Sequence, residues 1–229
     1  MVPKANQGAA SEISLRRCMG VSIGRHIACS LALALAAFAT TAQEKGTYAI
    51  DNAKSKLQID VYKEGAFKIF GHDHLIVAKE ISGQVQCDPQ KVEDSAVHLK
   101  VPANSLTVLG PGESEKDRRD VQATMTGEKV LYVAKFPEIV FTSTRVSAVK
   151  KTADGWELTL AGKLKLHGVE KPVSFPLRVR TAAGELRAQG EVSVLQTDYG
   201  IMPIKVGGGS VRVKDKLKIT FTIVATKGH

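Results

Sequence analysis

Two histidines one residue apart are the part of the sequence best suited to bind a metal ion or a polar ligand group. His72 and His74 lie on either side of Asp73. In an extended chain their side chains share a face, and two imidazoles at this spacing can ligate one metal if a third ligand, such as His98 or His167, comes from elsewhere. Alternatively, they are polar groups near the mouth of the fold, bonded to loop backbone and to Asp73. Because only two ligands are local, we favour the polar role and predict no metal and no cofactor.

Other residues give weaker signals for catalysis. The sequence has no Gly-x-Ser-x-Gly, and Cys87 has no cation immediately beside it that would lower its pKa. The glycine run 207–209 lacks the strand-to-helix context of a phosphate-binding loop, so we interpret it as a hairpin. His167 is out of phase with the apolar residues before it, and we expect it at a strand end, bonded to loop backbone. We therefore assign no catalytic residue.

The elements that must position these residues are long β-strands. Between Val211 and Val224, apolar side chains alternate with Lys, Arg and Thr, and only Asp215 interrupts the apolar face. A period of two is typical of a strand with one buried face. The same alternation returns in three further segments, 156–166, 173–179 and 186–194. Long strands that are apolar on one side predict a curled or closed antiparallel sheet around one apolar interior.

Turn signals divide the chain into strands and one helix. The strands are expected at about 47–51, 56–63, 66–71, 80–87, 96–102, 138–149, 155–166, 171–181, 185–196 and 211–225. One helix is expected near residues 113–127, where Val121 and Met125 share a face with the methyl of Thr124 and Gly127 is the stop. No repeat or linker suggests a second domain. The predicted fold class is all-β.

The beginning of the chain has the pattern of a secretory signal. Three arginines precede the uncharged run Ile27–Ala39, which is too short to cross a bilayer and therefore argues against an uncleaved anchor. Small residues follow, so cleavage is expected after Ala42 or Ala39. We expect residues 1–42 to be a removed signal peptide and residues 43–229 to form the exported domain.

The start codon and the cysteines fit the same interpretation. Residues 1–18 are interpreted as an extension, because a start at Met19 would give a signal of ordinary length. Cys18 and Cys29 would leave with the signal, and Cys87 alone cannot form an intramolecular disulfide. The expected location is periplasmic or secreted.

The charge of the chain excludes one class of partner. Of the formal net charge of +9, residues 1–42 carry +3 and residues 43–229 keep +6, which is dispersed mostly over outward strand positions without the interleaved aromatic residues of a nucleic-acid platform. We therefore predict no nucleic-acid binding. The same charge is compatible with transient contact with anionic membranes. The sequence leaves open whether the chain forms a homodimer.

Several motifs together resemble one family. They are Tyr48-Ala49-Ile50-Asp51, Gly71-His72-Asp73-His74, Ile81-Ser82-Gly83, Val101-Pro102-Ala103-Asn104-Ser105-Leu106, Phe136-Pro137, Leu164-Lys165-Leu166-His167-Gly168-Val169 and Thr197-Asp198-Tyr199-Gly200-Ile201. In this order they resemble the YceI-like family of exported lipid- or polyisoprenoid-binding proteins. The most specific motif is the one around His167 with Lys171-Pro172, although Glu170 stands where that family usually has Thr.

The resemblance implies a fold and a ligand. The fold is an extended, lipocalin-like antiparallel β-barrel of about eight strands around a long tunnel, and the ligand is a long apolar molecule, which is a polyisoprenoid, a quinone-like molecule or a fatty-acyl chain. The resemblance also implies a binding or carrier protein more than an enzyme. Two alternatives remain open: a metal-dependent enzyme or metal carrier that uses His72 and His74, and a packed barrel with a structural or interaction role.

The predicted ligand-binding residues combine the inward strand positions with the histidine pair. They are Phe67, His72, His74, Phe141, Leu158, Leu160, Leu164, Phe175, Leu177, Ile219 and Phe221.

Overall fold

The computed structural model describes residues 45–64, 73–110, 114–206 and 211–227. The expected signal peptide, residues 1–42, lies outside the described residues, as do the strand expected at 66–71 and two predicted site residues, Phe67 and His72. All described residues fall within one compact unit, Ala42–His229.

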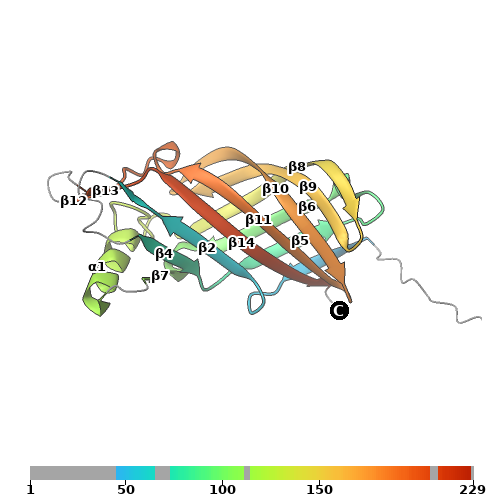
Figure 1. Ribbon diagram of the computed structural model, residues 1–229, viewed down its shortest axis with the longest axis horizontal. Coiled ribbons are helices and arrows are strands. Elements are labelled where there is room, and N and C mark those ends of the chain that lie inside the picture. The colour runs from blue at the N-terminus through green and yellow to red at the C-terminus, as the bar shows by residue number, and fades with distance from the viewer. Residues whose placement is uncertain (1–44, 65–72, 111–113, 207–210, 228–229) are drawn as a thin grey trace, which may run out of the picture. The chain divides into compact units, whose positions relative to one another are not determined.

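Eight antiparallel strands close into a barrel (Figure 1). In spatial order they are β1 (Gly46–Ile50), β5 (Ser82–Cys87), β6 (Ala96–Pro102), β8 (Glu138–Thr152), β9 (Gly155–Leu166), β10 (Val169–Ala182), β11 (Glu185–Leu195) and β14 (Lys216–Lys227). The last strand pairs with the first and so closes the barrel. The alternation of apolar and polar residues is the cause of this form, because it gives each strand one face that must leave water. The prediction of an eight-stranded, all-β barrel is confirmed.

Strand β14 pairs with three other strands of one eleven-stranded sheet. Its full length pairs with β11 on one side. On the other side its last residues pair with β1, whereas its first half pairs with β2 (Lys56–Val61). The strands β4 (His74–Ala78) and β7 (Leu106–Leu109) continue outward from β2, so the barrel wall divides into two branches along β14.

Ser55 completes the hydrogen bonding at this branch point. Its buried hydroxyl accepts a hydrogen bond from the N–H of Val224 at 3.0 Å and donates to the carbonyl of the same residue at 3.3 Å. The N–H of Asp51 donates to that carbonyl as well, at 2.8 Å. The side chain therefore satisfies backbone groups of β14 that neither branch pairs, which a buried strand requires.

The single strand expected at 211–225 is wrong. The chain forms β13 (Val211–Val213), breaks at Lys214 and Asp215, and resumes as β14. The carboxylate of Asp215 accepts hydrogen bonds from the N–H of Thr197 at 2.9 Å and from its hydroxyl at 2.6 Å, and these bonds turn the chain. The separated β13 pairs with β12 (Lys205–Val206) and β3 (Lys63–Glu64) in a small second sheet.

The strands β4 and β7 are absent from the predicted strands. Both are short, and β4 has apolar residues on both faces: Ile76 is buried, and Leu75 and Val77 are half-buried on the opposite face. Without alternation, a five-residue apolar run gives no period to recognise.

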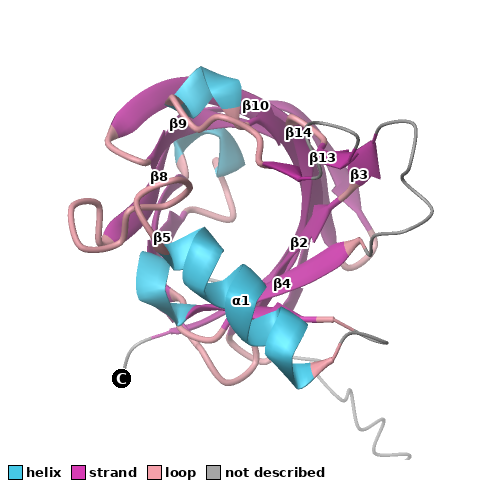
Figure 2. Cartoon of the chain, turned by 90° about the vertical axis from the view of Figure 1, so that its left-hand side faces the viewer, coloured by secondary structure: helices cyan, strands magenta, loops and turns pink. Residues whose placement is uncertain are grey.

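The predicted helix is confirmed as α1 (Glu115–Thr126). Ser114 caps its first turn by accepting a hydrogen bond from the N–H of Asp117 at 3.1 Å, and Gly127 follows its last residue. Three short 3-10 turns complete the described elements: η2 (Val92–Asp94), η3 (Ala103–Ser105) and η4 (Thr197–Tyr199). Figure 2 shows α1 lying across one end of the barrel. Among the described helices, none has the length and apolar character needed to span a bilayer.

Candidate ligand-binding tunnel

The barrel encloses a cavity of about 480 Å³ that is lined almost entirely by apolar side chains. Its lining runs from Met125 and Ile204 at the α1 end to Leu186 and Ala225 at the far end. The inward side chains of β9 show why the lining is apolar: Trp156, Leu158 and Leu160 alternate with outward-facing residues and are at most 8% exposed. A volume of this size falls in the range of small-molecule sites in proteins.

Nine of the eleven predicted site residues lie on this cavity. They are His74, Phe141, Leu158, Leu160, Leu164, Phe175, Leu177, Ile219 and Phe221. The other two, Phe67 and His72, lie outside the described residues. The structure thus brings together residues from five strands, and their contact with a ligand stays a prediction.

Three phenylalanines form a cluster in the tunnel wall. The ring centroids of Phe141 and Phe175 are 5.7 Å apart, and those of Phe175 and Phe221 are 5.6 Å apart. Two inward-facing glycines make room for the outer rings. A Cβ on Gly162 would lie 2.5 Å from the Phe141 ring, and one on Gly190 would lie 2.8 Å from the Phe221 ring. Neither glycine is among the predicted site residues, although a glycine at an inward strand position is a usable signal of close approach.

The polar groups on the cavity gather at its two ends. At the α1 end they are His74, which begins β4, the buried Gln196, and Asp120 and Thr124 of the helix. The side-chain amide of Gln196 donates to the carbonyl of Lys214 at 2.8 Å, which leaves its oxygen as an acceptor. Asp120 and Thr124 are themselves exposed, so the cavity reaches the surface beside the helix.

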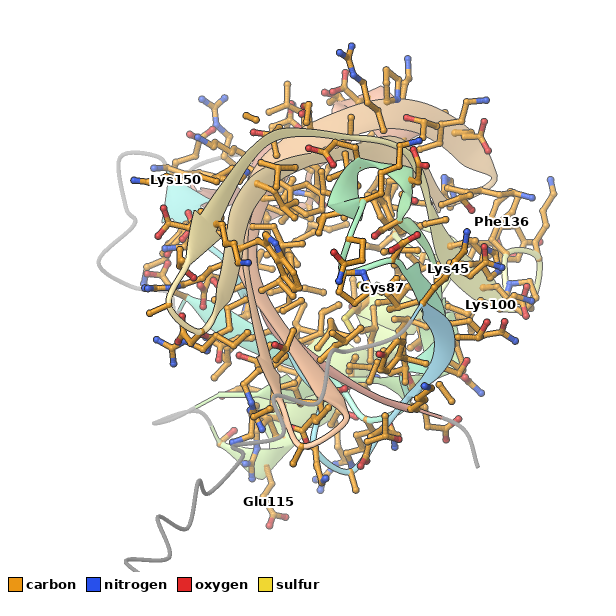
Figure 3. All side chains as sticks on the ribbon, turned by 90° about the vertical axis from the view of Figure 1, so that its right-hand side faces the viewer. Lys45, Cys87, Lys100, Glu115, Phe136 and Lys150 are labelled. Carbon is orange, nitrogen blue, oxygen red and sulfur yellow. The ribbon has the colours of Figure 1, made fainter. Side chains whose placement is uncertain are left out.

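Two polar side chains, Cys87 and Ser95, lie at the far end. Figure 3 shows Cys87 near the middle of the barrel when it is viewed from that end. Burial raises the pKa of the Cys87 thiol, the neighbouring Ser95 hydroxyl partly opposes this rise, and the charge of Asp88 adds to it. Ser95 Oγ is fully buried and has no partner of hydrogen-bonding geometry among the described residues. The far end therefore offers a ligand one buried hydroxyl and one thiol in apolar surroundings.

The two other histidines proposed as metal ligands have different partners. His98 is exposed on β6, with Nδ1 3.1 Å from the hydroxyl of Thr142. His167 lies at the turn between β9 and β10 with a φ of 51°, and its Nδ1 is 3.1 Å from the carbonyl oxygen of Tyr199. The expected bond from His167 to loop backbone is confirmed. Within the described ranges, no three His, Cys, Asp or Glu side chains gather as metal ligands would.

Comparison with known proteins gives matches over most of the chain. The YceI-like domain family matches residues 48–225. A UPF0312 protein of Pseudomonas fluorescens is 32% identical over 158 residues, which cover 63% of this chain and 75% of that protein. Protein YceI of Salmonella newport is 30% identical over 131 residues, and the match spans 62% of that protein's length and 55% of this chain.

Two solved structures share the fold. Burkholderia cenocepacia BcnA aligns with a TM-score of 0.59 at 20% identity, over 77% of this chain and 99% of BcnA. A polyisoprenoid binding domain from Saccharophagus degradans, implicated in plant cell wall breakdown, aligns with a TM-score of 0.57 at 16% identity, over 79% of this chain and 98% of that domain.

Proposed function

The chain belongs to the YceI-like domain family, and from this premise we propose that it is a carrier that holds a long apolar molecule in its tunnel. The ligand class is a polyisoprenoid, a quinone-like molecule or a fatty-acyl chain. Support for this class comes from the apolar lining and from a structural neighbour described as polyisoprenoid-binding. The proposed role is binding and transport rather than catalysis.

The observation that carries the proposal is the continuous apolar lining between two polar ends. Each methylene transferred from water into such a tunnel contributes about 0.8 kcal/mol, so a chain of about ten carbons suffices for tight binding. An elongated apolar chain fits an elongated apolar site, whereas a compact polar metabolite would leave its hydrogen-bonding groups unpaired there. A packed structural barrel, in contrast, would fill its interior with side chains in place of a cavity of about 480 Å³.

The polar groups give the ligand a direction. His74 and Gln196 face the cavity at the end where it reaches the surface beside α1. A quinone-like or phosphorylated end group would find hydrogen-bonding partners there, while the tail extends past the phenylalanine cluster toward Ser95. We therefore place the head group at the α1 end.

The location is part of the same proposal. The arginines, the apolar run Ile27–Ala39 and the small residues up to Ala42 support export and removal of residues 1–42. The carrier would then act in the periplasm or outside the cell, where an apolar molecule needs a protein to cross water.

Extraction of the purified protein tests this function. Native mass spectrometry before and after organic extraction should show the loss of an apolar molecule with no change in the polypeptide. The extracted protein should then take up a fluorescent isoprenoid or fatty-acyl probe saturably. A protein that releases no apolar molecule and takes up no probe would leave the packed-barrel alternative.

A further inference from the structure

The exposed large hydrophobic side chains gather at one end of the barrel. Among the described residues they are Tyr62, Leu109, Leu195 and Met202, and Met202 is 70% exposed. The strand register brings the first three to the same end. Leu195 pairs with Lys216 at the start of β14. Tyr62 lies beside that start, because its carbonyl accepts a hydrogen bond from the N–H of Lys214 at 2.7 Å, and Leu109 ends β7 opposite Leu75. Met202 follows η4, whose Tyr199 contacts the β9–β10 turn at this end. We call these four residues the apolar rim.

Three cationic side chains lie beside the apolar rim. Lys205, Lys214 and Lys216 are exposed, and none forms an ion pair in the part of the chain that the structure describes. The acidic residue closest to them in sequence, Asp215, is committed to Thr197 through two hydrogen bonds. The charge of these lysines is therefore available to an external anion.

The opposite end of the barrel differs in its apolar surface. It carries several ion pairs, namely Lys54 and Arg187 with Glu185, Arg180 with Asp154, and Lys91 with Asp94, together with the exposed Lys150 and Lys151, which form no ion pair among the described residues. No large hydrophobic side chain is exposed there among the described residues. An end without exposed large hydrophobic side chains suits water, whereas exposed apolar side chains next to unpaired lysines suit an interface between water and anionic lipid.

From this asymmetry we propose that the α1 end docks on a membrane that contains anionic lipid. The apolar rim would enter the interfacial region, and Lys205, Lys214 and Lys216 would contact lipid phosphates. This inference rests on the proposed carrier function and gives it a direction, because the cavity reaches the surface beside α1 at the docking end.

Docking also removes an energetic obstacle to ligand release. The transfer of a chain of about ten buried methylenes into water costs about 0.8 kcal/mol of free energy for each methylene, so release into bulk solvent is slow. A tunnel whose mouth lies against a membrane can pass the chain directly from one apolar phase to the other. The membrane is therefore the partner whose chemistry matches both the apolar rim and the ligand.

Flotation with lipid vesicles tests the proposal. The exported, processed chain is mixed at low ionic strength with vesicles of phosphatidylcholine containing phosphatidylglycerol, and with vesicles of phosphatidylcholine alone. We expect stronger binding to the anionic vesicles, reduced by salt. Lys214→Ser with Lys216→Ser should weaken this binding by about fivefold per lysine. Leu195→Ser with Met202→Ser should weaken it about tenfold or more on both kinds of vesicle.

A matched control comes from the opposite end. Lys150 and Lys151 are exposed on β8, and Figure 3 shows Lys150 at the outer edge of the barrel viewed from that end. Lys150→Ser with Lys151→Ser should leave vesicle binding within about twofold of the unmodified chain. Equal losses in the two lysine pairs, or no binding to either kind of vesicle, would overturn the docking proposal.

Probe uptake in vesicle-free solution separates this inference from the function on which it rests. If the unmodified chain takes up an isoprenoid or fatty-acyl probe but binds no vesicle, the docking proposal fails and the carrier function stands. If it binds anionic vesicles but takes up no probe, the carrier function fails and docking stands as a property of the surface. The six substituted side chains lie outside the cavity lining, so probe uptake should be unchanged in all variants.

Discussion

The backbone N–H of Val108 donates a hydrogen bond to Oε1 of Gln122 at 2.9 Å. The Nε2 of the same side chain donates to the carbonyl of Leu106 at 2.9 Å. Val108 and Leu106 belong to β7, which among the described strands has a partner on one side only. One glutamine of α1 therefore takes the place of a neighbouring strand, protects an exposed sheet edge and holds the helix at the mouth of the cavity.

Replacement of Gln122 should destabilise the protein and loosen α1. In Gln122→Ala the N–H of Val108, a residue only 5% exposed, loses its acceptor, which should cost about 1–3 kcal/mol of unfolding free energy. Chemical denaturation checks the loss, and hydrogen exchange at Val108 checks its location. Arg119→Ala on the exposed face of the same helix is the control, because its ion pair with Glu115 is exposed and contributes at most about 1 kcal/mol.

A charge in the tunnel wall should abolish binding of an apolar chain. Phe221→Asp would place a carboxylate among Phe175 and Leu177 with no partner, and we expect at least about a tenfold loss of probe affinity. Thr220→Asp is the control, since Thr220 is the exposed neighbour on the same strand. Probe titration measures the affinity and circular dichroism checks the fold. Equal affinities for the two variants would show that the probe binds elsewhere.

The reactivity of Cys87 should report on the occupancy of the tunnel. Burial raises the pKa of this thiol, so at pH about 8 its thiolate fraction is below that of a free cysteine and increases as the pH rises. We expect slow alkylation by a maleimide, faster at higher pH and several-fold slower again when an apolar ligand fills the cavity. Mass spectrometry of the alkylated chain follows the reaction. Alkylation at the rate of a free thiol, unaffected by ligand, would contradict a ligand beside Cys87.

His74 should select the polar end of the ligand. His74→Leu keeps the lining apolar, so uptake of a plain hydrocarbon chain should persist, while the preference for a quinone-like or phosphorylated end group should fall by about tenfold. The exposed His98→Leu is the control and should change neither quantity.

Metal analysis examines the competing role of the histidines. We expect no stoichiometric metal in the unmodified protein and none to be lost in the double variant His72→Ala with His74→Ala. About one zinc or similar ion per chain, absent from that variant, would favour the metal-dependent alternative over lipid binding.

The amino terminus of the exported protein should begin near Gln43 or near Thr40. The apolar run Ile27–Ala39 and the small residues after it are the basis for this expectation. Amino-terminal sequencing of the exported fraction checks it. An exported product that still begins at Met1 or Met19 would contradict the removal of a signal.

The inward-facing residues could be predicted because alternation specifies them. Phe175 and Leu177 share one face of their strand in any register that keeps the polar residues in water, and both line the cavity. The helix could be predicted for the same reason, because its apolar face, the capping residue Ser114 and the terminating Gly127 are signals within the local sequence. The ligand class had no such signal in the periodicity and depended on the family resemblance.

Features that depend on distant contacts could not be predicted. Asp215 breaks the last strand because it meets Thr197, which is 18 residues away in the sequence. Gly162 and Gly190 matter only because Phe141 and Phe221 lie over them. Ser95 reaches the cavity from the η2 turn, where no alternation marks an inward side. Each of these residues acquires its role from a partner that the local pattern does not specify.

The division of the wall along β14 gives the two halves of the tunnel different mechanical properties. In the far half, eight strands close on themselves, and the number and tilt of strands fix the bore. In the α1 half, the branch of β2, β4 and β7 is joined to the barrel by the β14 ladder and ends in an edge held by a helix side chain. Widening of this half would leave the closed ladder intact. A ligand of the proposed kind would therefore place its slender tail where the bore is fixed and its bulky head where the wall can adapt, so it would enter the protein tail first.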